Sequence, residues 1–170
     1  MVDHALSTNR FIGMIQTKDD ETLYEVGCLG KIVGFNETSD NRYLINLFGK
    51  SYFRVNSEDT SKHKFRIINA EILDQKETKN KEEKIKKFNI DLIDTYKAYV
   101  KNNNIDINTK EIELIEDIEL RAKFIAMVSP FSTQEKQALL EKYEIDSFCE
   151  TLISILNLYS TGQKETKSIN

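Results

Sequence analysis

The sequence predicts an α+β fold, in which a β-rich N-terminal half precedes an all-helical C-terminal half. Apolar residues recur at every second position in segments up to Leu73, which is typical of strands, and at spacings of three and four beyond Glu82, which is typical of helices. Between them, the highly charged segment 74–84 has no apolar periodicity. A chain of 170 residues with 39% hydrophobic residues is large enough for one ordinary soluble domain or two small ones.

The β-rich half contains four or five expected strands joined by short polar turns, as in an antiparallel sheet or barrel. The apolar alternation places the main strands at 11–16, 23–35, 43–55 and 65–73. From Tyr43 to Val55 the odd positions are mostly apolar. These positions are therefore expected to share one face of a strand or of a bent strand pair.

The helical half begins with an amphipathic helix from about Glu82, and Asn102 is expected to end it. Its apolar stripe consists of Ile85, Phe88, Leu92, Tyr96 and Tyr99. Shorter helices are expected at 109–115 and 118–128, after which Pro130 interrupts the pattern.

Two further helices are indicated by capping residues. Ser132 and Glu135 have the spacing of a capping box, so a helix is expected to begin there and to reach about residue 142. Asp146 is expected to cap a last helix that Gly162 closes.

These patterns divide the chain into three parts. The prediction is a β subdomain at 1–75, a helical subdomain at 76–162 and a flexible polar tail at 163–170. The charged segment 74–84 is either a linker or the solvated start of a helix, and the second interpretation is favoured from about Glu82.

Composition argues against several classes of protein. No run approaches the roughly 18 apolar residues that a membrane span requires, and the N-terminus has no secretory pattern, so a cytoplasmic protein is expected. Cys28 and Cys149 lie far apart and are expected to be reduced, buried thiols. The net charge of −4 argues against a general nucleic-acid binder.

The stretch LYEVGCLGKIVG at 23–34 raises the choice between a phosphate-binding loop and a glycine-containing strand. A phosphate loop normally lies between a strand and a helix, and no helical pattern follows here. Gly27 and Gly30 are therefore interpreted as strand glycines at a bulge or tight bend. Gly49-Lys-Ser51 resembles the end of a Walker A motif, but Leu44 stands where its first glycine is required.

No pattern of metal ligands or catalytic residues is found. His4 and His63 are lone histidines, and Cys28 is more simply a small buried thiol than a nucleophile activated by His63. A group of carboxylates is expected to form a solvated helical face. Its members are Glu111, Glu113, Glu116, Asp117 and Glu119. No catalytic, cofactor-binding or metal-binding residue is predicted.

Aromatic residues in the β-rich half offer weak candidates for an exposed binding face. Phe48 and Tyr52 fall on the strand face opposite Tyr43 and Phe53, and Tyr24 is a third candidate. If that face is exposed, it forms an apolar patch suited to extended peptide. The favoured alternative is that the helices cover it.

Several segments together resemble a known family. They are RFIGMIQ at 10–16, the stretch at 23–35, DNRYLINLFG at 40–49 and YFRV at 52–55. Their order and spacing resemble the N-terminal domain of Lon proteases, and most of all the short stand-alone bacterial proteins built from that domain alone. The segment MVSPFSTQEKQALL at 127–140 is similar to the part of the family that precedes its final helix.

The resemblance implies a PUA-like, mostly antiparallel β-barrel followed by a helical subdomain. It also implies recognition of polypeptide, because this domain contributes to substrate binding and assembly in full Lon. Neither a Walker A motif nor a segment similar to the Ser–Lys peptidase domain is found, so the chain is expected not to be an enzyme and to need no cofactor.

The family usually has an extra strand and a proline-containing segment before the stretch that matches Met1–Leu6. A misassigned start is the favoured explanation, ahead of a truncated product or a replaced strand. A missing strand would leave the barrel incomplete, with an unpaired edge that favours dimerisation, strand addition or aggregation.

The leading hypothesis is a non-catalytic module that binds unfolded polypeptide or a protein partner, without membrane contact. The alternative is an RNA-binding PUA-like protein, for which the basic residues are diluted by acidic ones. These basic residues are Lys76, Lys79, Lys81, Lys84, Lys86 and Lys87. A thiol enzyme that uses Cys28 is the third option. The sequence assigns no binding residues, and the identity of the bound protein is left open.

Overall fold

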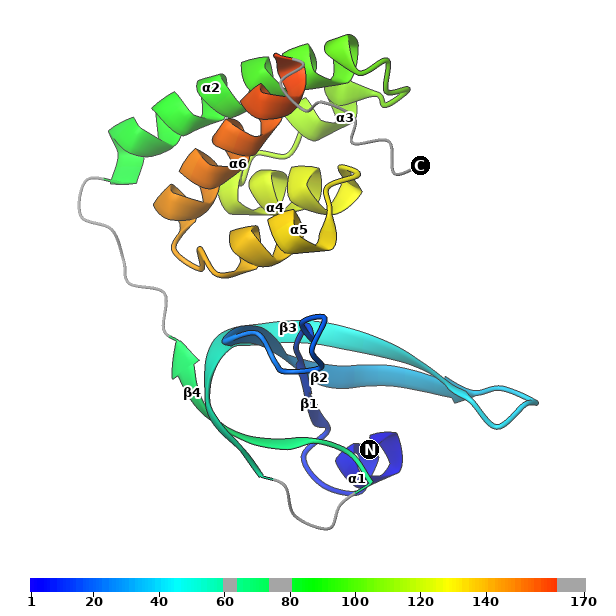
Figure 1. Cartoon of the computed structure of the whole chain (residues 1–170). Coiled ribbons are helices and arrows are strands. Elements are labelled where there is room, and N and C mark those ends of the chain that lie inside the picture. The colour runs from blue at the N-terminus through cyan, green and yellow to red at the C-terminus, as the bar shows by residue number, and fades with distance from the viewer. Residues whose placement is uncertain (60–63, 74–80, 162–170) are drawn as a thin grey trace, which may run out of the picture. The chain divides into compact units, whose positions relative to one another are not determined.

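A computed structural model describes residues 1–59, 64–73 and 81–161, with only the backbone described at 81–86 (Figure 1). The chain divides into two compact units, Met1–Gln75 and Lys76–Asn170. We call them the β unit and the helical unit and describe each by itself.

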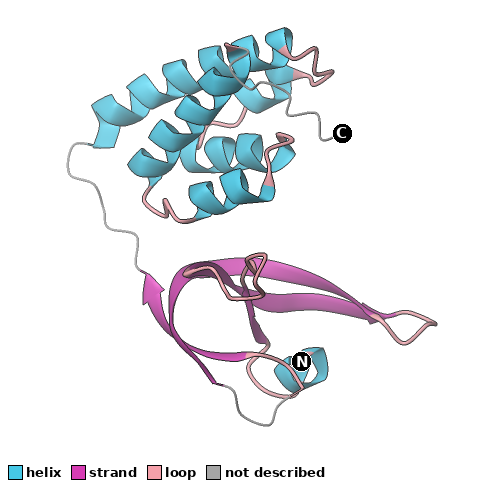
Figure 2. Ribbon diagram, in the orientation of Figure 1, coloured by secondary structure: helices cyan, strands magenta, loops and turns pink. Residues whose placement is uncertain are grey.

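The β unit is an antiparallel sheet preceded by a short helix (Figure 2). Its elements are α1 (Val2–Leu6), β1 (Phe11–Met14), β2 (Val26–Glu37), β3 (Tyr43–Asp59) and β4 (Ile67–Leu73). The strands follow one another in the order β1-β2-β3-β4, so β1 and β4 are the edge strands. The sheet curves in the manner of a barrel, but in the described part of the chain β1 and β4 do not pair and the sheet is not closed.

Bulges in the long β2–β3 pair change which residues share a face. Leu29 pairs with Ser51 and Gly30 with Gly49, which leaves Lys50 as an extra residue in β3. An extra residue reverses the alternation of faces beyond it. The prediction that the odd positions of 43–55 share one face is therefore wrong. The odd positions before Lys50 lie on one face, and those after it lie on the other.

Gly27 is required by close packing within the sheet. A Cβ atom at this position would lie 2.4 Å from Cζ of Phe53 and 2.7 Å from the carbonyl oxygen of Met14. Phe53, which is 2% exposed, lies directly over the glycine. The prediction of a strand in this stretch is confirmed, and Gly30 lies at a register shift as expected of a bulge. Gly27 itself is in register and makes room for an aromatic ring.

A small core joins α1 to the sheet. Ala5, Ile12 and Ile32 are buried together, with half-buried apolar residues from α1 and β3 packed around them. The hydroxyl of Tyr43 donates a hydrogen bond to Oδ1 of Asp3 at 2.6 Å. These contacts hold α1 against the sheet beside β1.

Within residues 81–161, the helical unit contains five helices around one apolar core. They are α2 (Lys81–Asn102), α3 (Thr109–Glu113), α4 (Ile118–Val128), α5 (Thr133–Leu140) and α6 (Ile145–Ser160). The predicted stripe residues Leu92, Tyr96 and Tyr99 are buried in the core, against Leu152 and Leu156 of α6. The α+β prediction is confirmed.

The helix caps confirm one sequence prediction and correct another. Ser132 and Glu135 form the reciprocal capping box, with the Ser132 N–H donating to Oε2 of Glu135 at 2.9 Å. The N-cap of α6 is Glu144, so Asp146 lies in the first turn of the helix and does not cap it. Gly162 and the predicted tail at 163–170 lie outside the described residues.

Replacing Ser132 with alanine is expected to destabilise the helical unit by about 1 kcal/mol, because the backbone N–H of Glu135 loses its capping acceptor. Urea denaturation followed by circular dichroism at the helical minimum measures the change. The matched control is Ser154→Ala, since Ser154 is exposed and its hydroxyl bonds only to the carbonyl of Glu150 one turn back. An equal loss of stability in both variants would contradict the capping role.

Arg121 on α4 is buried, and its polar contacts with described residues are to oxygen atoms that carry no formal charge. It is 5% exposed. Its guanidinium donates to the carbonyl oxygens of Ile112 (3.2 Å), Glu113 (3.1 Å) and Ile115, and to Oδ1 of Asn89 (2.5 Å). These carbonyls lie at the C-terminal end of α3, where backbone oxygens lack helical partners and carry a partial negative charge.

Candidate functional site

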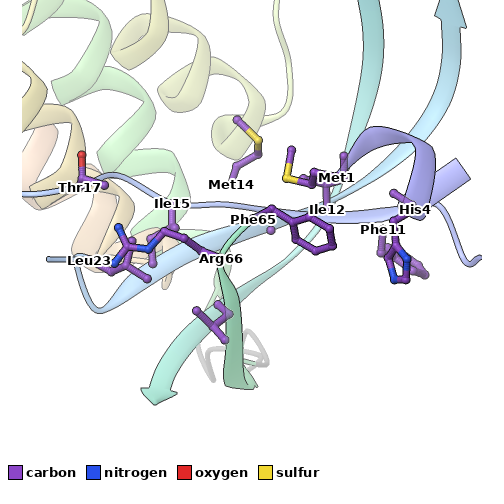
Figure 3. A pocket seen from close by; sticks show the side chains of 13 residues that line it. Met1, His4, Phe11, Ile12, Met14, Ile15, Thr17, Leu23, Phe65 and Arg66 are labelled. Carbon is purple, nitrogen blue, oxygen red and sulfur yellow. The ribbon is translucent and has the colours of Figure 1, made fainter. Parts of the chain in front are cut away.

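An apolar groove lies beside β1 in the β unit (Figure 3). Its volume is about 380 Å³. Residues of α1, β1 and the segment 65–68 form most of its lining, and Met1, Ile15, Thr17 and Leu23 complete it. We call it the β1 groove.

The side chains of the β1 groove are mostly apolar and only partly covered. Met14 is 52% exposed. Phe11, Ile15, Leu23 and Phe65 are half-buried. Side chains that are apolar and partly exposed gain free energy when a ligand removes them from water.

Two contacts connect the segment 65–68 to other parts of the β unit. The ring centroids of His4 on α1 and Phe65 lie 5.6 Å apart. Nη1 of Arg66 donates to the carbonyl oxygen of Glu21 at 2.9 Å. Arg66 is itself fixed by a two-pronged contact with the carboxylate of Glu58, at 2.5 Å for each oxygen. These hydrogen bonds from Arg66 lower the pKa of the Glu58 carboxyl, so the ion pair persists at neutral pH.

The aromatic candidates from the sequence do not line this groove. Phe48 pairs with Lys31 and Tyr52 pairs with Cys28, three positions earlier on β2. They therefore lie on opposite faces of the sheet, and the prediction of a shared aromatic face is wrong. Phe48 is 56% exposed, whereas Tyr24 and Tyr52 are half-buried.

The groove was missed by sequence reasoning because its two walls are far apart in the chain. One wall is β1, and the other is the segment 65–68 at the start of β4. Each segment by itself reads as an ordinary strand with apolar alternation. Only the open arrangement of the sheet places both segments beside one space.

The described residues contain no group of three or more His, Cys, Asp or Glu residues that could hold a metal ion. His63 lies outside them, so its relation to Cys28 stays a prediction. Cys28 is half-buried, with Sγ 3.9 Å from the carbonyl oxygen of Leu29. Burial raises the pKa of the Cys149 thiol to about 12, so this thiol is almost entirely protonated at neutral pH and unreactive.

The remaining candidates have structural roles or are exposed. Gly49-Lys-Ser51 lies within β3, which is not the loop that a phosphate site requires. The carboxylates of Glu111, Glu113, Glu116 and Asp117 are exposed, and the half-buried Glu119 pairs with a lysine one turn away. Searching the described residues for a membrane span found no helix with the necessary length and apolar character.

Comparisons with known proteins agree with the fold. The chain is similar to a Lon N-terminal domain protein from Xanthomonas campestris, at 14% identity and a TM-score of 0.63, over 90% of this chain and 80% of that one. It is also similar to the N-terminal domain of the Lon protease of Mycobacterium avium complex, at 12% identity and a TM-score of 0.67, over 94% and 82%. No curated protein matched the sequence.

The sequence model of one family covers almost the whole chain. It is that of the ATP-dependent protease La (LON) substrate-binding domain, and it matches residues 1–158. The match spans both the β unit and the helical unit. The chain therefore belongs to the Lon substrate-binding domain family.

Proposed function

We propose that the protein is a non-catalytic module that binds unfolded polypeptide, and that the β1 groove is where it binds. Family membership supports polypeptide as the class of ligand. The observation that supports this location is the partly exposed apolar lining of the groove, in which Met1 and Met14 are more than half exposed. Unfolded chains differ from folded ones chiefly by presenting apolar side chains and free backbone groups. The groove offers contacts for the apolar side chains.

Further parts of the proposal come from the sequence and the family. Only the Lon substrate-binding domain is found in the chain, and no catalytic domain is detected. The protein is accordingly proposed to act by binding alone. The cytoplasm, as expected from the sequence, is its proposed location. Nothing in the described residues favours RNA as the ligand, and the predicted basic cluster falls almost wholly on side chains outside the described set.

The direct test of the class of ligand is a fluorescence-anisotropy titration. The labelled ligand is a reduced and alkylated protein that cannot refold, and the same protein in its folded form is the control. Saturable binding of the unfolded form alone is expected. Equal binding of both forms, or of neither, contradicts the proposed function.

The location is tested by placing a charge in the groove. Replacing Met14 with aspartate is expected to weaken binding of the unfolded protein about tenfold or more, because contact with one apolar side chain is lost and a carboxylate must be desolvated. Met14 is exposed in the free protein, so the fold should tolerate the change.

The matched control is Leu44→Asp, which makes the same kind of change at another exposed strand position. Leu44 is 64% exposed and does not line the groove. This variant should bind as the unsubstituted protein does. Equal weakening by the two substitutions would exclude the β1 groove as the principal site.

A further inference from the structure

The outer edge of β1 presents backbone hydrogen-bonding groups to the groove. The N–H of Ile32 donates to the carbonyl oxygen of Arg10 at 2.8 Å, so the backbone of Arg10 faces β2. In an antiparallel pair this direction alternates. The backbone groups of Ile12 therefore also face β2, whereas those of Phe11 and Gly13 face away from it.

Among the described residues of β1, Gly13 is a position where this edge is open. The N–H of Phe11 is already bonded to Oδ1 of Asn9 at 3.0 Å. Gly13 is exposed, lies opposite Leu29 in the register of β1 with β2, and lines the β1 groove. Because Gly13 has no side chain, another backbone can approach it closely.

We propose that the β1 groove binds an extended segment of another polypeptide, which adds a strand to β1 by hydrogen bonding to Gly13. This inference rests on the proposed function and specifies its ligand: a short extended segment with apolar side chains at every second position. Strand addition draws affinity from backbone hydrogen bonds and selectivity from pockets for alternate side chains. A helical ligand satisfies its own backbone groups and could not use those of Gly13.

The lining of the groove matches such a ligand. Side chains on one face of the added strand would meet the apolar residues Met14, Ile15 and Phe65. The ring contact between His4 and Phe65 places an apolar surface next to this edge. An extended segment thus finds backbone partners at Gly13 and apolar contacts beside it.

Amide hydrogen exchange tests the proposal. The probe is a synthetic peptide of alternating valine and threonine, with a lysine at each end for solubility. In the free protein the amide of Gly13 should exchange rapidly and that of Ile12 slowly. Saturation with the peptide should slow exchange at Gly13 at least about tenfold and leave Ile12 unchanged.

A matched pair of N-methylated peptides distinguishes backbone pairing from apolar contact alone. In each peptide every second residue is N-methylated, and the two peptides differ in which alternate set of residues carries the methyl groups. One peptide should lose at least about tenfold in affinity, since its methyl groups replace the N–H groups that face β1, and the other should bind nearly as the parent does. Equal affinities for the two peptides overturn strand addition.

The remaining outcomes distinguish failure of strand addition from failure of the proposed function. If the unfolded protein binds but the valine–threonine peptide does not, or if the peptide binds without protecting Gly13, strand addition is wrong and the proposed function stands. If neither ligand binds, the proposed function itself fails. If Gly13 is already protected in the free protein and loses protection on dilution, the occupant is a second copy of this chain and the proposal is overturned.

Discussion

Replacing Arg121 with leucine is expected to lower the free energy of unfolding of the helical unit by about 3–5 kcal/mol. The guanidinium is buried and donates to three backbone carbonyls and to Asn89. Leucine fills part of the space but donates no hydrogen bond. The part-buried carbonyl oxygens of Glu113 and Ile115 would then lose the donor that Arg121 provides, while that of Ile112 keeps the backbone N–H of Ile115. Losing a donor at a buried acceptor costs more than the loss of an exposed hydrogen bond.

Urea denaturation followed by far-ultraviolet circular dichroism measures this effect, because helices dominate that signal. The control is Lys123→Leu on the same helix, two positions away. Lys123 contacts Glu119 at 2.5 Å in a partly exposed pair, so its loss should cost no more than about 1 kcal/mol. If Arg121→Leu were no more harmful than Lys123→Leu, the buried network would not hold α3 in place.

The second large effect is expected at Gly27, where alanine should destabilise the β unit by about 1–3 kcal/mol. The added methyl group would overlap the ring of Phe53 and the backbone oxygen of Met14. Neither can move easily, because Phe53 is buried and Met14 is paired with β2. The sheet would have to shift between β1 and β3, which also disturbs the β1 groove.

Hydrogen exchange at the amide of Ile12 reports the stability of this sheet separately from that of the helical unit. The control is Gly34→Ala, because a Cβ atom there meets only the flexible side chain of Asn46, at 3.4 Å or more. That variant should be nearly neutral. Normal protection of Ile12 in Gly27→Ala would show that the ring contact is not restrictive.

The elements were predictable where the pattern was local. The helix at 118–128 was placed at both ends from its apolar spacing, and the capping box at Ser132 was read directly from two residues. The sequence predicts the last helix but indicates Asp146 as its cap, whereas Glu144 holds that position. Glu144 makes no side-chain cap hydrogen bond, so no capping signal marks the true boundary.

The arrangement of side chains on the sheet was not predictable in the same way. The bulge at Lys50 exchanges the faces on which successive residues of β3 lie, and the alternation of residues in the sequence does not indicate it. Register depends on the partner strand, and a single extra residue exchanges the inner and outer faces. For this reason Phe48 and Tyr52 appeared to share a face, and the groove between β1 and the segment 65–68 did not appear at all.

The predictions that concern how the helices relate to the sheet stay predictions. The suggestion that helices cover an aromatic face of the sheet concerns both units at once. Each unit has its own core. Leu92 and Ile125 are buried in the core of the helical unit, and Ile12 and Ile32 are buried in the core of the β unit. Family membership rests on a match over residues 1–158 and does not depend on that arrangement.

The central claim is that unfolded polypeptide binds in the β1 groove. A nitrogen–proton correlation spectrum of the protein, recorded during titration with the reduced and alkylated protein, tests it most directly. The claim predicts that the largest shifts fall on Phe11–Ile15 and on Phe65–Ile68. Shifts confined to the helical unit, or to the exposed strand positions around Leu44 and Phe48, would contradict it.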